Sequence, residues 1–232
     1  MNTKLVLLPG MDGTGILFAD FVKALPEKFD ARVVRYPNDS FLPYSDLMTF
    51  VQSAAQSSEA FVLVAESYST PLAIQFAATH PPNLKGLILC AGFATSPIRG
   101  WRRLLASLIP PVVFRISLPK MAMSHFLVGP DAPESLHAPV RAAIGSVKPQ
   151  VLTERLLQIL EVDARSALSQ VLVPILYIQG ARDRLVNASS LAEIRAIRPQ
   201  TKIVRIDGPH LIVQREPHQC AKAVAEFIEI VG

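Results

Sequence analysis

The stretch Val62 to Pro71, VLVAESYSTP, joins an apolar run to a helix-like run through a single serine, Ser67. The apolar run predicts a buried strand, and the residues after the serine predict a helix. A sharp turn between them would push the Ser67 hydroxyl out beside the helix N-terminus and force a positive φ at that residue. Such a turn also crowds the positions two residues before and after the serine, where the small residues Ala65 and Ser69 stand.

Six short apolar runs rich in β-forming residues occur along the chain. They are KLVLLP (4–9), ARVVRY (31–36), AFVLVAE (60–66), LKGLILCAG (84–92), VPILYIQG (173–180) and TKIVRID (201–207). Most are continuously apolar, which is typical of strands covered on both faces. Helical patterns separate them, at about 17–25, 44–57, 67–79, 188–197 and 217–230. This alternation predicts an α/β fold with a mostly parallel six-stranded sheet flanked by helices.

Residues 95–168 interrupt this alternation with several prolines and amphipathic pieces, but with no clear strand. A long insertion between two strands of an α/β core predicts a helical cap over one edge of the sheet. We therefore expect a single domain, with a core formed by residues 1–94 and 169–232. The length of 232 residues, 50% of them hydrophobic and 18% charged, suits one globular domain.

The composition also excludes several classes of partner. The net charge of +4 comes without a long Lys/Arg run, so no nucleic-acid partner is predicted. Cys90 and Cys220 are predicted to be reduced structural thiols, and no Cys/His cluster suggests a metal or a cofactor. The opening apolar run is too short for a membrane span or a signal peptide, so we expect a cytoplasmic protein.

The serine stretch resembles a known motif. Residues 65–69, AESYS, resemble the G-x-S-x-G nucleophile elbow of the α/β hydrolases, with both glycines replaced. Residues 9–15, PGMDGTG, resemble the oxyanion loop of the same family, with proline in place of its histidine. The resemblance implies that the N–H groups of Met11 and Tyr68 hold an oxyanion, with Gly10 at the turn beside the substrate. A purely structural glycine-rich turn is the alternative reading of this loop.

The family's acid and base follow in the same chain order. Residues 180–183, GARD, resemble its acid loop and imply Asp183 as the acid, while Gly208-Pro-His210 resembles its histidine loop and implies His210 as the base. Asp163 and Asp207 are the alternative acids. For the remaining histidines we expect capping, surface or structural roles; they are His80, His125, His137 and His218.

The resemblance also implies a topology. We expect the first two antiparallel strands of the family to be absent, since the chain opens directly on KLVLLP. The serine-bearing strand should lie beside the first strand, with the second strand on the other side of the first. The order of the strands then reverses at the first strand, so that the connections run to opposite sides of it. A ligand would bind there, at the carboxyl ends of the strands.

Together these residues predict a serine hydrolase that cleaves an ester or thioester of a small to medium, largely apolar acyl substrate. Ser67 would attack the acyl carbonyl, His210 would take its proton, and Asp183 would fix the imidazole. Two alternatives stay open, because the fold does not fix the reaction. One is a slow or inactive ligand-binding protein on a hydrolase scaffold, and the other is a cofactor-free C–C hydrolase or lyase.

Several residues of the predicted cap bear on the substrate. Phe114, Met121, Met123 and Phe126 are predicted to line an acyl pocket, or else to pack the cap on the core. The first half of this segment is basic. It could attract an acidic acyl-carrier protein or a carboxylated chain, or be a solvated face. Its basic residues are Arg99, Arg102, Arg103, Arg115 and Lys120.

Overall fold

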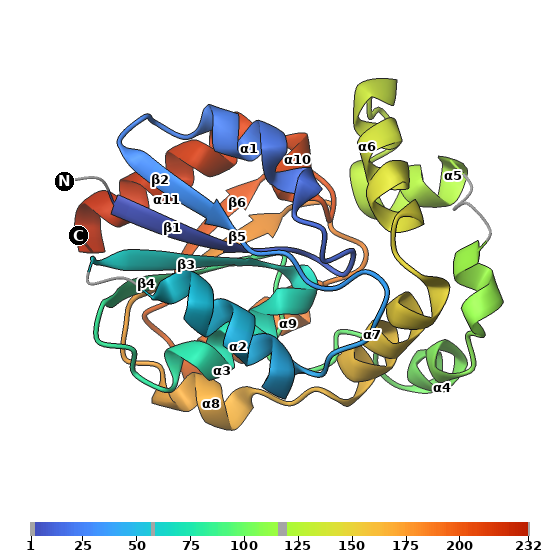
Figure 1. Cartoon of the computed structure of the whole chain (residues 1–232), viewed down its shortest axis with the longest axis horizontal. Coiled ribbons are helices and arrows are strands. Elements are labelled where there is room, and N and C mark those ends of the chain that lie inside the picture. Colours follow the sequence, from blue (N-terminus) through green and yellow to red (C-terminus); the bar gives the residue numbers. More distant parts are fainter. Residues whose placement is uncertain (1–2, 57–58, 116–119, 232) are drawn as a thin grey trace.

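The computed structural model, which describes residues 3–56, 59–115 and 120–231, has a six-stranded sheet between two layers of helices (Figure 1). The strands are β1 (Thr3–Leu8), β2 (Phe29–Val33), β3 (Phe61–Glu66), β4 (Leu84–Cys90), β5 (Ile175–Gly180) and β6 (Lys202–Ile206). All five pairings are parallel, in the order β2-β1-β3-β4-β5-β6. The six-stranded sheet is therefore confirmed.

The order of the strands brings two loops together. β1 lies between β2 and β3, and its last residue, Leu8, is in register with Ala65, directly before the end of β3. The loops that follow β1 and β3 therefore leave the same edge of the sheet side by side, as the topology implied. The predicted second strand was placed too late, because Val34 and Tyr36 already belong to the loop that runs along β1.

Side chains alternate between the two faces of each strand. In β1, Leu5 and Leu7 pack in one core, whereas Val6 and Leu8 pack in the other, and all four are fully buried. The continuous apolar run of this strand follows from that double burial. The first core is covered by α1 (Ala19–Ala24), α10 (Ile212–Arg215) and α11 (Pro217–Val231). The second is covered by α2 (Tyr44–Ala55), α3 (Thr70–Ala77), α8 (Arg165–Gln170) and α9 (Ala188–Ile197).

Two of the predicted helices begin with a tighter turn. The 3-10 turn η1 (Ile16–Phe18) precedes α1, and η2 (Ser67–Ser69) precedes α3. The two thiols behave as structural residues, since Cys90 and Cys220 are buried and form no disulfide. In the described parts of the chain, no helix combines the length and the apolar character that crossing a bilayer requires.

The segment between β4 and β5 is helical wherever it forms regular structure in the described residues. It contains α4 (Trp101–Ser107), η3 (Pro111–Arg115), α5 (Lys120–Met123), η4 (Ser124–Val128), α6 (Glu134–Gly145) and α7 (Pro149–Glu161). Figure 1 shows this inserted segment beyond the carboxyl ends of the strands, which is where the loops after β1 and β3 emerge.

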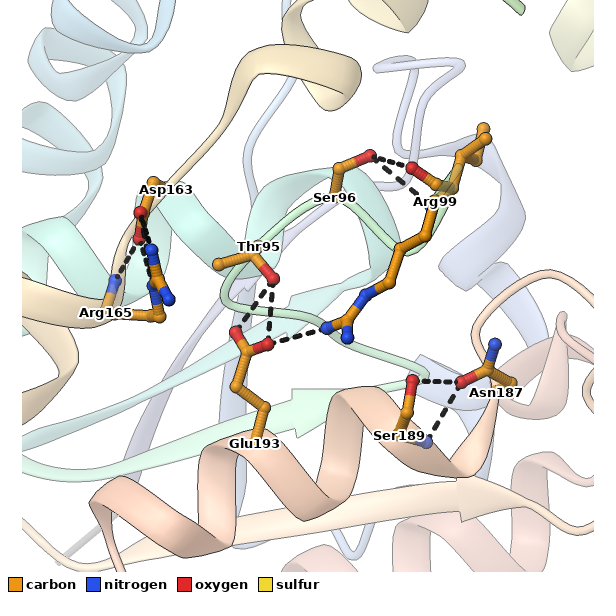
Figure 2. A network of polar contacts seen from close by, with 9 residues as sticks. Thr95, Ser96, Arg99, Asp163, Arg165, Asn187, Ser189 and Glu193 are labelled. Carbon is orange, nitrogen blue, oxygen red and sulfur yellow. Dashed lines mark hydrogen bonds and ion pairs between the residues drawn. The ribbon is translucent and has the colours of Figure 1, made fainter. Parts of the chain in front are cut away.

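The two ends of the inserted segment leave the core side by side. Thr95 and Asp163 form an isolated antiparallel bridge, and the N–H of Ala164 donates to the carbonyl of Ala94 at 2.8 Å. Figure 2 shows the hydroxyl of Thr95 and the guanidinium of Arg99 converging on one carboxylate of α9. That carboxylate, Glu193, accepts hydrogen bonds from them at 2.8 and 2.7 Å, so the start of the inserted segment is fixed to the core.

The loops after β5 and β6 approach each other so closely that only glycine fits. A Cβ on Gly180 would lie 2.2 Å from the carbonyl oxygen of Pro209, well inside van der Waals contact. The backbone of Arg182 also donates to the carbonyl of Gly208 at 2.8 Å, which locks the two loops together.

Replacing Gly180 by alanine should therefore destabilise the fold. We expect Gly180→Ala to lower the free energy of unfolding by about 1–3 kcal/mol, because the added methyl group forces two backbone segments apart. Gly145→Ala is the matched control, since a Cβ there has no atom within 4 Å. Urea unfolding followed by circular dichroism measures both. An unchanged midpoint for Gly180→Ala would show that the loops are not held this tightly.

Candidate active site

Ser67 stands in the strained turn that the sequence predicts. It directly follows β3 and has a φ of 45°, in the left-handed region. Its carbonyl accepts a hydrogen bond from the Thr70 hydroxyl at 2.7 Å, which ties the turn to the first residue of α3. Ala65 and Ser69 are both fully buried, as expected for the positions that such a turn crowds. The φ of 45° confirms the positive φ predicted at Ser67.

Three side chains from distant loops form one hydrogen-bonded chain. Ser67 Oγ lies 2.9 Å from His210 Nε2, and His210 Nδ1 lies 2.8 Å from Asp183 Oδ2. Asp183 follows β5, and His210 follows β6. The second carboxylate oxygen of Asp183 accepts from the N–H groups of Leu185 and Val186, at 2.8 and 2.9 Å. The structure thus brings together the hydroxyl, imidazole and carboxylate that the sequence singled out.

Burial and charge act on His210 in opposite directions. Only 6% of its side chain and 2% of that of Asp183 are exposed. Burial lowers the pKa of His210, but the charge and the hydrogen bond of Asp183, with the charge of Glu66, raise it to above its ordinary value of 6.5. The site therefore favours an imidazolium at His210 more than water does.

The peptide planes that carry the Met11 and Tyr68 N–H groups are both fixed by their carbonyls. The carbonyl of Gly10 accepts from the N–H of Gly13 at 3.0 Å, and the carbonyl of Ser67 accepts from Thr70. In a trans peptide the N–H points opposite to the C=O. Each of the two N–H groups is therefore held pointing away from its own turn.

A cavity of about 340 Å³ opens above Ser67. Its volume lies in the range of small-ligand sites. The polar residues of its lining are Asp12, Glu66, Ser67 and His210. The rest of the lining is almost wholly apolar and includes Leu17, Phe93, Met123, Phe126, Leu152 and Ile159. This cavity suits an apolar group placed beside a reactive hydroxyl.

The residues predicted to line a pocket divide into three groups. Gly10, Met123 and Phe126 lie in the wall of the cavity. Met121 does not, and 82% of it is exposed. Two residues along a helix correspond to a rotation of about 200°, so Met121 and Met123 of α5 point to nearly opposite sides. The side chain of Phe114 lies outside the described residues.

Sequence comparison identifies the family of the chain. Residues 38–207 match the family described as serine aminopeptidase, S33, a group of α/β hydrolases. The chain belongs to this α/β-hydrolase family. The match spans more than half of the chain and both ends of the inserted segment. The chain is thus a member of a hydrolase family, with the sheet expected of one.

Individual relatives are distant. The α/β hydrolase is 28% identical over 195 residues to the biotin biosynthesis bifunctional protein BioHC of Cellvibrio japonicus. That alignment covers 77% of this chain but only 37% of the relative, so the chain spans little more than a third of its length. Among solved structures, olei00960, a hydrolase from Oleispira antarctica, has a TM-score of 0.85 at 13% identity, covering 99% of this chain and 92% of that one.

A second solved structure is the enol-lactonase from Burkholderia xenovorans LB400. It has a TM-score of 0.79 at 16% identity, with coverage of 99% of this chain and 92% of that one. At these identities the likeness shows the fold alone.

The hydroxyl of Ser69 has a role that the sequence did not reveal. It donates a hydrogen bond to the carbonyl of Pro9 and, with its only proton used there, accepts one from the Tyr36 hydroxyl at 2.7 Å. A glycine at this position of the elbow would lack both bonds. In this α/β hydrolase, the residue that replaces the glycine thus ties the Ser67 turn to the loop after β1.

Arg155 of α7 holds the same loop from the opposite side. Its guanidinium donates to the carbonyls of Met11, Asp12 and Pro37, each at 2.8 Å. Only 2% of this residue is exposed, and its charge also lies over the rings of two tyrosines, 5.8 Å from the centre of Tyr68. The inserted segment therefore fixes the loop that carries the Met11 N–H.

Two further carboxyl groups border the cavity. Asp12 accepts from the N–H of Thr14 at 2.9 Å within the turn after β1, and burial raises its pKa. Glu66 accepts from Gln214 at 3.0 Å, while its other oxygen has no protein partner. Burial, opposed by the Gln214 hydrogen bond, raises the pKa of Glu66 to about 7. Near pH 7 the residue before Ser67 is therefore partly protonated.

The other candidate acids and bases do not join the hydrogen bonds of Ser67, His210 and Asp183. Asp163 pairs with Arg165, and Asp207 pairs with Arg182, both at exposed positions. Each remaining histidine has a surface or local contact: His80 with the Gln170 carbonyl, His125 with Arg184, His137 with Ser124, and His218 with solvent. Among the described residues, no group of three or more His, Cys, Asp or Glu side chains is arranged to hold a metal ion.

Removing the Arg155 guanidinium should loosen the loop after β1. We expect Arg155→Met to lower the free energy of unfolding by about 3 kcal/mol, because three buried carbonyls lose a charged donor. Hydrolytic turnover should fall at least about tenfold in kcat with a smaller change in KM. Arg155→Lys should restore part of both. Arg141→Met, at a more exposed arginine of α6, is the control. A folded Arg155→Met enzyme with unchanged kcat would contradict this role.

Glu66 should make stability depend on pH. Its carboxyl ionises near pH 4.5 when unfolded and near 7 when folded, so the wild type loses stability as pH rises between these values. We expect Glu66→Gln to gain about 3 kcal/mol over the wild type between pH 4.5 and 8. Urea unfolding across this range measures it, with exposed Glu161→Gln as control. A difference that stays constant with pH would refute the prediction.

Proposed function

We propose that this protein is a serine hydrolase that cleaves an ester or thioester with an apolar acyl group through an acyl-enzyme. The observation that carries the proposal is the chain of hydrogen bonds from Ser67 to His210 to Asp183, at 2.9 and 2.8 Å. These are the distances that an activated serine and its base require. Ser67 and His210 lie in the wall of a largely apolar cavity, which supports an apolar substrate.

The hydrogen bonds of Asp183 set the direction of proton transfer. One carboxylate oxygen accepts from two backbone N–H groups, and the other accepts from the N–H of His210 Nδ1. The lone pair of Nε2 then faces Ser67 Oγ and takes its proton as Oγ attacks the acyl carbon. The Met11 and Tyr68 N–H groups would hold the oxyanion of the tetrahedral intermediate.

The second half of the reaction reverses these transfers. The imidazolium of His210 gives its proton to the leaving alkoxide or thiolate, and the acyl group stays on Ser67. Water then enters and attacks the acyl carbon while His210 takes one of its protons. The bond from the acyl carbon to Ser67 Oγ breaks, His210 returns the proton to Oγ, and the carboxylic acid leaves. Because the neutral imidazole is the base, activity should rise with pH through the pKa of His210, which lies above 6.5.

The inserted segment supports the choice of substrate. We infer that residues 95–168 act as a cap, because Met123, Phe126 and Ile159 from this segment form part of the cavity wall. An enol-lactone is a cyclic ester, so the Burkholderia protein named for it is compatible with ester hydrolysis on this fold. An acidic acyl-carrier protein remains a candidate carrier of the acyl group.

The proposal is tested at the serine. We expect Ser67→Ala to lower kcat on p-nitrophenyl acyl esters by at least about 10⁴-fold and to abolish labelling by a fluorophosphonate, with folding retained. We expect Asp183→Asn to lower kcat about 10⁴-fold, because the asparagine favours the wrong tautomer of the His210 imidazole.

Two results would overturn it. Full turnover by Ser67→Ala would reject the mechanism. Wild-type protein that neither reacts with the fluorophosphonate nor turns over any ester, thioester or C–C substrate would instead be a ligand-binding protein.

A further inference from the structure

Helix α4 presents an apolar stripe to solvent. Trp101, Leu104, Leu105 and Leu108 follow the i, i+3, i+4, i+7 spacing of one helical face, and Leu108 directly follows the last residue of α4. They are exposed to 70, 65, 55 and 68%. In a globular protein such a stripe normally faces the core. Among the described side chains of α4, only Ala106 is buried, so the stripe is directed away from the core.

The apolar surface continues through the next two elements. Val112 and Val113 of η3 are exposed to 51 and 46%, and Met121 of α5 to 82%. We call these seven residues, Trp101 to Met121, the outer apolar face. In Figure 1, α4 and α5 lie at the edge of the molecule farthest from the strands. Exposed apolar surface on this scale marks an interaction site in a soluble domain.

The same part of the chain holds the positive charge of the protein. Residues 99–130 contain five Lys and Arg residues and no Asp or Glu. The rest of the chain has 18 basic and 19 acidic residues, a net charge of −1, so the +4 of the whole chain comes from this segment. Arg103 and Lys120 are exposed beside the outer apolar face.

Residues close in sequence to the outer apolar face line the cavity. Ile98, three residues before Trp101, lines the cavity, as do Ala122 and Met123, directly after Met121. Phe126 belongs to the cavity wall and is still 43% exposed. One segment therefore has apolar side chains directed outward and apolar side chains directed toward Ser67.

We propose that the outer apolar face docks on an anionic lipid surface, and that the substrate is an apolar ester taken from that surface. The choice of substrate rests on the proposed function, whereas the docking does not. Apolar side chains flanked by basic ones are the arrangement by which peripheral helices lie in the headgroup region of a bilayer. Basic side chains at such a surface are attracted to anionic lipids.

Charge argues against a second copy of the chain on this face. A symmetric contact would place the same basic segment of both copies together, and like charges across an interface are unfavourable. An acidic protein would match the charge, but seven exposed apolar residues and an apolar cavity match a lipid phase more completely.

Tryptophan fluorescence can report directly on the outer apolar face, because Trp101 is the only tryptophan of the chain. We expect its fluorescence to shift to the blue on adding vesicles of phosphatidylcholine with about 30% phosphatidylglycerol. Binding to pure phosphatidylcholine vesicles should be at least about tenfold weaker, and binding to the anionic vesicles should weaken as salt rises. Ser67→Ala should bind as the wild type does, which separates docking from catalysis.

A pair of double variants supplies the control. Leu105→Asp/Leu108→Asp should weaken vesicle binding at least about tenfold and keep activity on a short soluble ester such as p-nitrophenyl acetate. Leu172→Asp/Ile230→Asp changes the net charge equally at exposed apolar residues beside the start of β5 and at the end of α11. It should bind vesicles as the wild type does. Circular dichroism verifies the fold of both.

Four results would overturn the proposal. These are no binding to anionic vesicles, equal binding to neutral ones, equal loss in the two double variants, and dimerisation by light scattering that only Leu105→Asp/Leu108→Asp abolishes. The last would assign the face to a second copy. Binding to an acidic acyl-carrier protein without binding to vesicles would likewise assign it to a protein partner.

Discussion

The turn at Ser67 is the constraint on which the rest of the site depends. A strand that passes into a helix within one residue must adopt a left-handed backbone there, and a φ of 45° on a residue with a side chain persists only when its surroundings hold it. The Thr70 hydroxyl does so by donating to the Ser67 carbonyl, and it accepts in turn from the Phe93 N–H at 3.0 Å. The turn is thus bound to the loop after β4 as well as to α3. The hydroxyl of Ser67 projects from it toward His210.

The loop after β1 is held from two directions. Ser69 binds it from the elbow through the Pro9 carbonyl, and Arg155 binds it from the inserted segment through the Met11 and Asp12 carbonyls. A backbone loop with buried carbonyls needs such donors. The inserted segment therefore does more than form part of the cavity wall, because its α7 contributes to the shape of the backbone beside Ser67.

Residues whose placement follows from strand ends and chain order could be predicted from the sequence. The strands, the strain at Ser67 and the meeting of Ser67, Asp183 and His210 are of this kind, since carboxyl ends of parallel strands share one edge. Arg155 could not be predicted, because its partners are backbone carbonyls 118 to 144 residues away, and carbonyls leave no pattern in a sequence. Met121 was misplaced because short helical pieces give too few turns to define a face.

The joined ends of the inserted segment have a consequence for how such a chain can change. The Ala164 N–H bonds to the Ala94 carbonyl, so the segment starts and finishes at one point of the core. Insertions, deletions or wholesale exchange between these residues would leave the sheet registers untouched, provided that a donor replaces Arg155. The segment can therefore change in length and composition while the sheet and the hydrogen bonds of Ser67, His210 and Asp183 stay in place.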